Sequence, residues 1–181
     1  FNEGLQKLLQ ALIKHHKRVL FNGDGYSAAW PKEAAKRGLP NFKTTMDALQ
    51  ALRNPANQAI FEKYSVLSSV EMNSRYEIGM EDYHRRVRIE GAIALEIARS
   101  MIRPVVADEF SKLATAMAQA KKDNLAAGMK GLKALALKLG TGLDDLHTKC
   151  EALDKALTKG LHEDVLKSLA DLRKTVDALE L

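Results

Sequence analysis

The feature that most constrains the fold is a stretch from Ser69 to Lys122 that keeps helical periodicity throughout. In its first part, apolar side chains recur at spacings of four, three and four residues, at Tyr76, Met80, Tyr83 and Val87. Beyond Gly91 there are two apolar stripes: Ile93, Ile97, Met101 and Val105, and Ile102, Val106, Phe110, Leu113 and Met117. A helix that is apolar on more than one side must be covered by more than one neighbour. We therefore expect a helical spine, about 80 Å long at about 1.5 Å per residue.

Pro104 is the one defect in this spine. Proline cannot donate the hydrogen bond that the carbonyl of Ser100 would accept, and its ring crowds the same turn. Apolar positions recur at helical spacing on both sides, so a kink is favoured over a break. We expect the half before about Gly91 to pack on the short helices that precede it, and the half after it to belong to a bundle.

The first 67 residues predict short helices separated by turns. The expected helices run over 4–17, from Ala28 to Gly38, from Thr44 to Leu52 and from Pro55 to Tyr64. Ser27 is expected to cap the second helix, and Gly38 followed by Pro40 is the expected signal for its end. Between the first two helices, Asn22-Gly23-Asp24-Gly25 predicts a turn, because glycine and asparagine tolerate positive φ. Trp30 is expected to anchor the packing of this region.

Two long helices with regular seams are expected after a turn at Asp123-Asn124. Their seams are Leu132, Leu135, Leu139, Leu143, Leu146, Cys150, Leu153 and Leu157, and then Val165, Leu169, Leu172, Val176 and Leu179. The first seam stays in phase through Gly140 and Gly142, so we expect one helix that ends at Gly160. The sequence thus predicts an all-α fold, with an irregular short-helix subregion over 1–67 and a long kinked helix plus antiparallel three-helix bundle over 68–181.

Charge and composition narrow the function classes. The 181 residues carry a net charge of +5, but acids and bases are interleaved almost everywhere, which is typical of a solvated helix surface and gives nucleic-acid binding little support. No apolar run approaches the ~20 residues of a membrane span. Cys150 is the single cysteine and lies on a seam, so we expect it to be a buried packing residue in a cytoplasmic protein. Because the chain begins at Phe1 without methionine, we expect it to be a piece of a longer protein.

Two motifs could carry chemistry, and both are better explained as structure. Asn22-Gly23-Asp24-Gly25 lacks the alternating acids of a calcium loop and the Lys-Ser/Thr of a P-loop. Glu81 and His84 form the Glu-x-x-His of helical di-iron proteins, but the second such motif that those proteins need is missing. A polar helix face with a Glu81–Arg85 contact is favoured. The residues alone predict no catalytic, cofactor-binding or metal site, and a chain that is not a self-sufficient enzyme.

Three blocks of sequence share a specific order and spacing. They are Phe21-Asn22-Gly23-Asp24-Gly25-Tyr26-Ser27 with Trp30 and Arg37-Gly38-Leu39; Thr44-Thr45-x-Asp47-Ala48-Leu49 with Phe61-Glu62-Lys63; and Glu71-x-x-Ser74-Arg75-Tyr76-Glu77-Ile78 with Glu81, Tyr83, Ile89-Glu90 and Ile102-x-Pro104. Together they resemble the C-terminal region of type III glutamine synthetases, the long-chain bacterial form. The resemblance covers roughly residues 10–110 and continues as a similar heptad-rich helical tail.

The resemblance implies a parent enzyme that makes glutamine from glutamate, ammonia and ATP through a γ-glutamyl phosphate, with Mg or Mn as divalent metal. The family's metal ligands and nucleotide-gripping arginines lie upstream, in the β-grasp and catalytic domains, so no catalytic, cofactor or metal residue is carried onto this chain. We expect a structural role, in packing against the upstream catalytic domain of the same chain and in a ring-shaped homo-oligomer. The candidate structural or interface residues are Asn22, Asp24, Tyr26, Trp30, Arg75, Glu77, Glu81 and Tyr83. A stand-alone helical scaffold and, less favoured, a di-metal helical protein stay open as alternatives.

Overall fold

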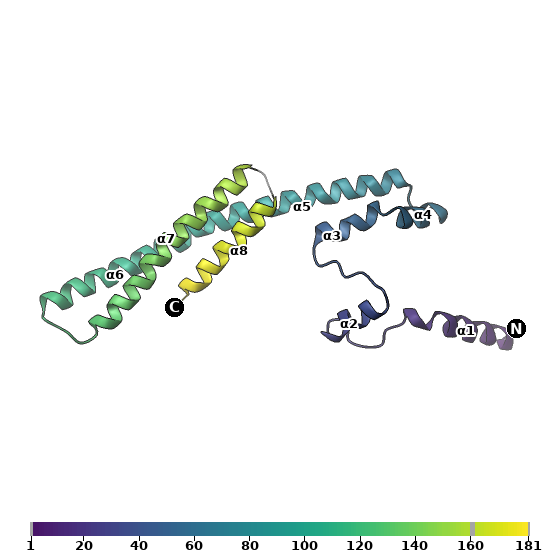
Figure 1. Cartoon of the computed structure of the whole chain (residues 1–181), viewed down its shortest axis with the longest axis horizontal. Helices are drawn as coiled ribbons and strands as arrows, with labels where there is room; N and C mark the ends of the chain where they lie inside the picture. Colours follow the sequence, from purple (N-terminus) through teal and green to yellow (C-terminus); the bar gives the residue numbers. More distant parts are fainter. Residues whose placement is uncertain (1, 160–161, 181) are drawn as a thin grey trace. The chain divides into compact units, whose positions relative to one another are not determined.

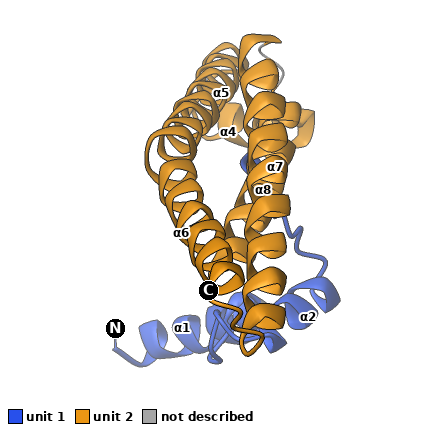
Figure 2. Cartoon of the chain, turned by 90° about the vertical axis from the view of Figure 1, so that its left-hand side faces the viewer, with its two compact units in different colours: residues 1–48 blue, residues 49–181 orange. Residues whose placement is uncertain are grey.

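The computed structural model describes residues 2–159 and 162–180, and the described chain contains helices and no strand, which confirms the predicted all-α class (Figure 1). Its α-helices are α1 (Asn2–His16), α2 (Ala29–Lys36), α3 (Thr45–Leu49), α4 (Pro55–Lys63), α5 (Ser69–Ile97), α6 (Arg103–Lys122), α7 (Met129–Lys159) and α8 (His162–Leu179). The chain divides into two compact units, residues 1–48 and 49–181 (Figure 2). The domain boundary expected between residues 67 and 68 stays a prediction.

In the first unit, both ends of α2 were predicted from the sequence. Its end is as expected: Gly38 adopts a φ of +71°, its N–H donates to the carbonyl of Ala35 over 3.1 Å, and the N–H of Leu39 donates to the carbonyl of Ala34 over 2.9 Å. Its start is not. The residue before the helix is Ala28, with no side-chain cap, and the Ser27 hydroxyl donates instead to the carbonyl of Asp24. The expected Ser27 cap is wrong because the turn ahead of the helix uses that hydroxyl.

The short helices after α2 begin at side-chain caps. The N–H of Asp47 donates to Thr44 Oγ1 over 3.1 Å, and Thr44 Oγ1 donates to Asp47 Oδ2 over 2.7 Å, so Thr44 caps α3 where a helix was expected to start. After α3 the chain tightens into the 3₁₀ turn η2 (Gln50–Arg53), where a single helix through Leu52 was expected. Asn54 Oδ1 then caps α4 by accepting from the N–H of Ala56 over 2.9 Å.

The expected spine is present from Ser69 to Lys122 as α5, the π-helical segment η3 (Ala98–Ile102) and α6. A capping box at Ser68 and Glu71 starts it. At η3 the N–H of Arg103 donates to the carbonyl of Ala98, one residue further back than in an α-helix. The missing amide of Pro104 falls directly after this wider turn, so the chain stays helical through the proline and is not broken.

The first half of α5 packs on η2 and α4, as expected, but the boundary expected near Gly91 is wrong, because Tyr83 and Val87 already pack in the bundle core. Met72 and Tyr76 are only 1% and 8% exposed, and Gln50 Nε2 donates to the Tyr76 hydroxyl over 3.1 Å. The Arg53 guanidinium lies 5.0 Å from the centre of the Tyr76 ring. An aromatic ring and a methionine are therefore the anchors of this contact.

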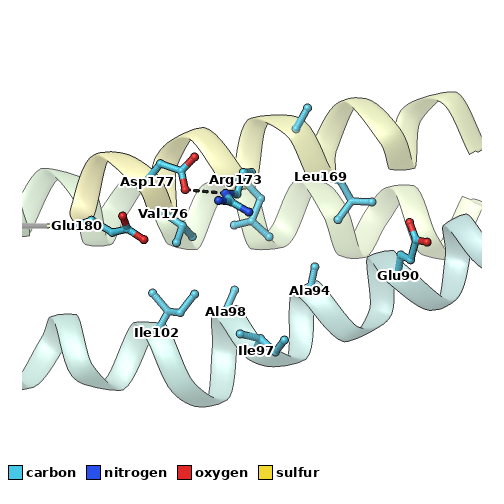
Figure 3. A pocket seen from close by; sticks show the side chains of 12 residues that line it. Glu90, Ala94, Ile97, Ala98, Ile102, Leu169, Arg173, Val176, Asp177 and Glu180 are labelled. Carbon is cyan, nitrogen blue, oxygen red and sulfur yellow. Dashed lines mark hydrogen bonds and ion pairs between the residues drawn. The ribbon is translucent and has the colours of Figure 1, made fainter. Parts of the chain in front are cut away.

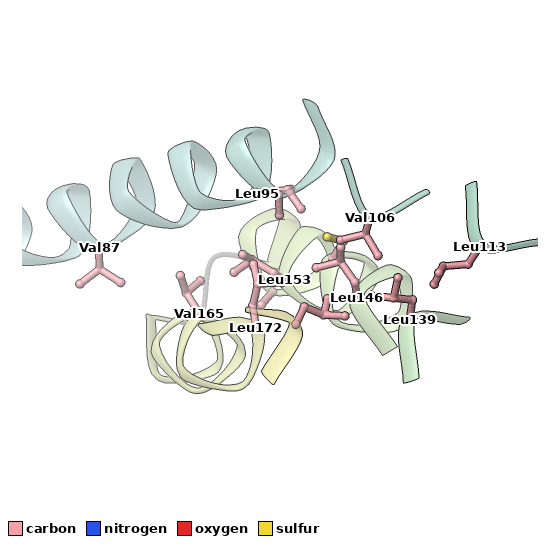
Figure 4. Packing of buried hydrophobic residues seen from close by; sticks show 13 residues of the cluster. Val87, Leu95, Val106, Leu113, Leu139, Leu146, Leu153, Val165 and Leu172 are labelled. Atoms are coloured by element: carbon pink, nitrogen blue, oxygen red, sulfur yellow. The ribbon is translucent and has the colours of Figure 1, made fainter. Parts of the chain in front are cut away.

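The second half of the spine forms the predicted bundle with α7 and α8. Residues 123–128 turn the chain between α6 and α7, with positive φ at Asn124 and Gly128, and α7 runs unbroken through Gly140 and Gly142. The expected end at Gly160 lies outside the described residues. The bundle core is lined by both predicted seams and by one face of the spine, called the inner stripe from here on (Figure 4). The inner stripe contributes Val87, Leu95, Val106 and Leu113, of which Leu95 was on neither predicted stripe. The seams contribute Leu139, Leu146, Cys150, Leu153, Val165 and Leu172. Each fully buried leucine stabilises the fold by about 1.5–3 kcal/mol, whereas a glycine inside a helix costs about 1 kcal/mol. Burial of the seam therefore outweighs the cost of Gly140 and Gly142 in α7.

Candidate interaction surfaces

The first candidate surface is the turn between α1 and α2. Asp24 organises it, because its Oδ1 accepts from the N–H of Tyr26 over 2.9 Å and its carbonyl accepts from the Ser27 hydroxyl over 2.8 Å. Asn22 and Tyr26 are exposed, and the Tyr26 side chain extends fully into solvent. The Asp24 carboxylate holds the backbone of the turn, and the turn exposes the Tyr26 phenol and the Asn22 amide to solvent. Exposed groups of this kind are suited to recognition of another protein.

Trp30 lies in α2 and packs against Phe21, so it anchors this region as expected. Its ring centroid is 4.3 Å from that of Phe21, and the Arg37 guanidinium lies 5.6 Å from the centre of the Phe21 ring. Arg37 also donates to the carbonyl of Leu20 over 2.9 Å and pairs with Glu33 over 2.7 Å. Beside Trp30 there is a hollow of about 530 Å³, lined by Val19, Trp30, Arg37 and Leu39. Its apolar walls suit a docked apolar side chain.

The second group of predicted residues lies along α5, in the other unit. Arg75, Glu77 and Glu81 are exposed, and Glu81 pairs with Arg85 over 2.8 Å, which confirms the predicted contact. Tyr83 is half-buried and packs against the bundle core. This group is a solvated polar face with one aromatic turned inward, and no two of its four members form a hydrogen bond or ion pair with each other among those that the structure records.

His84 takes a partner that sequence spacing does not reveal. Its ring stacks on that of His162, with centroids 4.3 Å apart and an angle of 25° between the planes. Its Nε2 is buried and has no hydrogen-bond partner among the described residues. The two histidines are far apart in sequence, and only the packing of α8 on α5 brings them together. The imidazole of the Glu-x-x-His motif is thus used in helix packing.

Cys150 and Arg99 lie near each other where α7 passes η3. Cys150 is fully buried, as predicted, and burial raises the pKa of its thiol, with Arg99 and Arg103 opposing that shift. Arg99 donates to Glu151 over 2.9 Å and to Asp154 over 2.7 Å, and these hydrogen bonds raise the pKa of its guanidinium. This clamp ties the π-helical segment to α7, and no sequence spacing pointed to it.

A groove of about 630 Å³ lies between α8 and the α5–η3 part of the spine (Figure 3). Its walls are apolar, with Ala94, Ile97 and Ile102 on one side and Leu169 and Val176 on the other. Arg173 and Asp177 pair across 2.6 Å at its edge. The groove has the character of a helix-binding surface rather than a reaction site.

Two helical faces are apolar and exposed. One is on α1, where none of the described residues is buried: Leu5, Leu8, Leu9, Leu12 and Ile13. The other is the outer stripe of the spine: Ile89, Ile93, Ile97, Met101 and Val105. Contiguous exposed apolar patches larger than a few hundred Å² mark interaction surfaces. Both faces therefore belong among the candidate sites, together with the residues that the sequence singled out.

Two further kinds of site, metal centres and membrane spans, have no candidate in the described part of the chain. Over 2–159 and 162–180, no three His, Cys, Asp or Glu side chains are grouped closely enough to hold a metal ion. Within that same part of the chain, no helix has the length and hydropathy to cross a bilayer.

Comparison with known proteins gives the chain its family. Residues 4–121 match the family described as glutamine synthetase C-terminal domain. The glutamine synthetase of Butyrivibrio fibrisolvens is 32% identical over 190 aligned residues, covering 98% of this chain and 27% of that protein. The type-3 glutamine synthetase of Dictyostelium discoideum is 36% identical over 98 residues, covering 54% of this chain and 13% of that protein.

A third relative, the glutamine synthetase of Bacteroides fragilis (strain YCH46), is 29% identical over 112 residues, which is 62% of this chain and 15% of that protein. The chain thus spans roughly a quarter or less of the length of these relatives. The matched residues contain all three blocks on which the resemblance was based, so that inference is confirmed. The chain belongs to the glutamine synthetase C-terminal domain family.

Proposed function

We propose that this chain is the C-terminal part of a glutamine synthetase that joins ammonia to glutamate at the expense of ATP. The observation that carries this proposal is the family match over residues 4–121 in a chain that spans only a quarter of its longest-matching relative. The reaction would take place upstream of this chain, in a cytoplasmic enzyme that uses ATP and Mg²⁺ or Mn²⁺. None of the described residues is assigned to catalysis.

The role of the chain itself is structural: it packs against the upstream catalytic domain and contributes to a ring-shaped homo-oligomer. The apolar face of α1 supports the first part, because all five of its large side chains, from Leu5 to Ile13, are between 44% and 59% exposed. Because each side chain is already about half covered, covering the rest contributes roughly half of the about 1.5–3 kcal/mol that full burial of a leucine gives. The neighbouring turn with Asn22, Asp24 and Tyr26, and the packed Trp30, would extend the same contact. On α5, the exposed Arg75, Glu77 and Glu81 would line a second contact, with Tyr83 positioning that helix.

The test uses the full-length enzyme with residues 1–181 deleted, measured for glutamine formation and for oligomer mass. The proposal expects both to change, and unchanged mass together with unchanged activity would refute it. A finer variant replaces Leu8 and Leu12 with Glu on the apolar face of α1. Its matched control replaces Lys7 and Lys14, which lie on the opposite face, with Gln, so that the net charge changes by the same amount. We expect the first pair to lower activity at least tenfold and the control pair to leave it unchanged.

A further inference from the structure

The outer stripe of the spine is a regular apolar surface that the described part of the 49–181 unit leaves open. Its exposed fractions are 52% at Ile89, 54% at Ile93, 42% at Ile97, 63% at Met101 and 69% at Val105. An α-helix has 3.6 residues per turn, so a stripe of residues spaced four apart gradually rotates around the helix axis. The wider π turn at Ala98–Ile102 opposes that rotation, so the stripe stays on one face across Pro104.

The apolar residues of the stripe lie at equal distances on either side of its central residue, Ile97. Four residues to either side of Ile97 lie Ile93 and Met101, and eight residues to either side lie Ile89 and Val105. Such a pattern suits an isologous two-fold contact. In that contact, two copies of the helix run antiparallel, and each residue faces the one at equal distance on the other side of the centre.

The charges beyond the stripe follow the same symmetry with opposite sign. Eleven residues to either side of Ile97 lie Arg86 and Asp108, and fifteen residues to either side lie Asp82 and Lys112. Each stands seven residues, or two turns, beyond a member of the stripe and so lies on the same face. Within one copy they already form the pairs Arg86–Asp82 and Lys112–Asp108, both at 2.7 Å. An antiparallel second copy would place Arg86 opposite Asp108 and Asp82 opposite Lys112.

We propose that this face is a two-fold interface with a second copy of the chain, centred on Ile97. The charges favour a second copy as the occupant, because in the antiparallel pair an acid faces a base at both ends of the contact. Like charges at these positions would weaken it. Equal numbers of acids and bases give no reason to expect a membrane or a nucleic acid here. From Asp82 to Lys112 the contact would run about 45 Å at about 1.5 Å per residue. The inference rests on the proposed assembly role and names the surface that performs it.

Disulfide trapping in the full-length enzyme tests the geometry. A residue at the two-fold centre faces its own copy, so Ile97→Cys should give a covalent dimer on oxidation, above the background of the unchanged enzyme. Ile78→Cys, on the same helix and 63% exposed, is the control that should not. Ile89→Cys and Val105→Cys copies with different tags, mixed, should link to each other and not to themselves. Links of 89 to 89 and 105 to 105, or no link at all, would overturn the proposal.

Assembly mass tests the energetics. Met101→Asp should halve the mass of the full-length assembly, or dissociate it fully if no other contact holds, whereas Ile78→Asp, at the same 63% exposure, should leave it intact. Arg86→Asp and Asp108→Arg should each weaken the contact about fivefold, and the two together should restore it. If Met101→Asp leaves the mass unchanged while deleting residues 69–181 lowers it, this interface is wrong and the assembly role stands. If neither change has any effect on mass, both proposals fail.

Discussion

Replacing Gly91 with alanine should destabilise the bundle, although the same change usually strengthens a helix. A Cβ at Gly91 would lie 2.9 Å from Val165 Cγ1 and 3.0 Å from Leu157 Cδ2. Val165 is fully buried and β-branched, so its methyl group cannot turn away. Overpacking of this kind costs about 1–3 kcal/mol, against a helix gain of about 1 kcal/mol for alanine. We expect a net loss of about 1 kcal/mol.

Gly131 is the matched control, because it lies in α7 with no atom within 4 Å of the position its Cβ would take. Gly131→Ala should therefore raise stability by about 1 kcal/mol. In urea, with a slope of about 2 kcal/mol per molar, the two midpoints should differ by about 1 M. Circular dichroism follows the helices, and the fluorescence of Trp30, which lies in the other unit, should not respond to either change.

A second variant isolates the cause. If the overlap with Val165 sets the cost, Gly91→Ala should become stabilising in a Val165→Ala background, because the missing methyl groups leave room for the new one. A Gly91→Ala chain as stable as Gly131→Ala would refute the close contact between α5 and α8. Loss of stability that persists in the Val165→Ala background would trace the cost to Leu157 instead.

Two further predictions concern single side chains. Because burial raises the pKa of the Cys150 thiol, a thiol reagent at pH 8 should modify it about 100-fold more slowly in the folded chain than in urea, and equally fast reaction would contradict its burial. Hydrogen bonds from the Ser68 backbone and hydroxyl lower the pKa of Glu71 below its usual 4.5. The folded pKa is thus depressed, so this cap stabilises the fold above about pH 4.5 and is lost as the pH falls below that. Glu71→Gln should lose less stability than the unchanged chain between pH 5 and pH 3, with Glu77→Gln as the control on the same helix, and equal losses would show that the Glu71 carboxylate contributes nothing to the cap.

The helical architecture could be predicted from the sequence because its signals are local. Spacings of three and four residues placed the spine and both seams, and the buried Leu139, Leu146 and Leu153 lie on the seam that was expected. Gly38 and Thr44 marked helix ends because caps depend on residues within one turn. The prediction that Ser27 caps α2 was wrong for a local reason as well. The Ser27 hydroxyl could bond either the first turn of α2 or the turn before it, and it donates to the carbonyl of Asp24.

The candidate sites depended on contacts between distant residues, which local patterns do not specify. Two such contacts depend on which helices pack against each other. They are the stacking of His84 on His162 and the pairing of Arg99 with Glu151 and Asp154. The groove beside α8 likewise exists only where α8 lies on α5. Motif blocks identified the family, but they could not say which of their residues face solvent.

The two apolar stripes of the spine are equally hydrophobic in sequence, and only the structure distinguishes the buried stripe from the exposed one. The inner stripe contains Val106 and Leu113, each 8% exposed, and it is covered by the bundle. The outer stripe contains Met101 and Val105, which are equally apolar but 63% and 69% exposed. One continuous helix thus carries the core of the bundle on one face and an open surface on the other. Truncating Leu113 to alanine should cost about 2–5 kcal/mol of folding stability, whereas truncating Met101 should cost little and act only where another surface covers it.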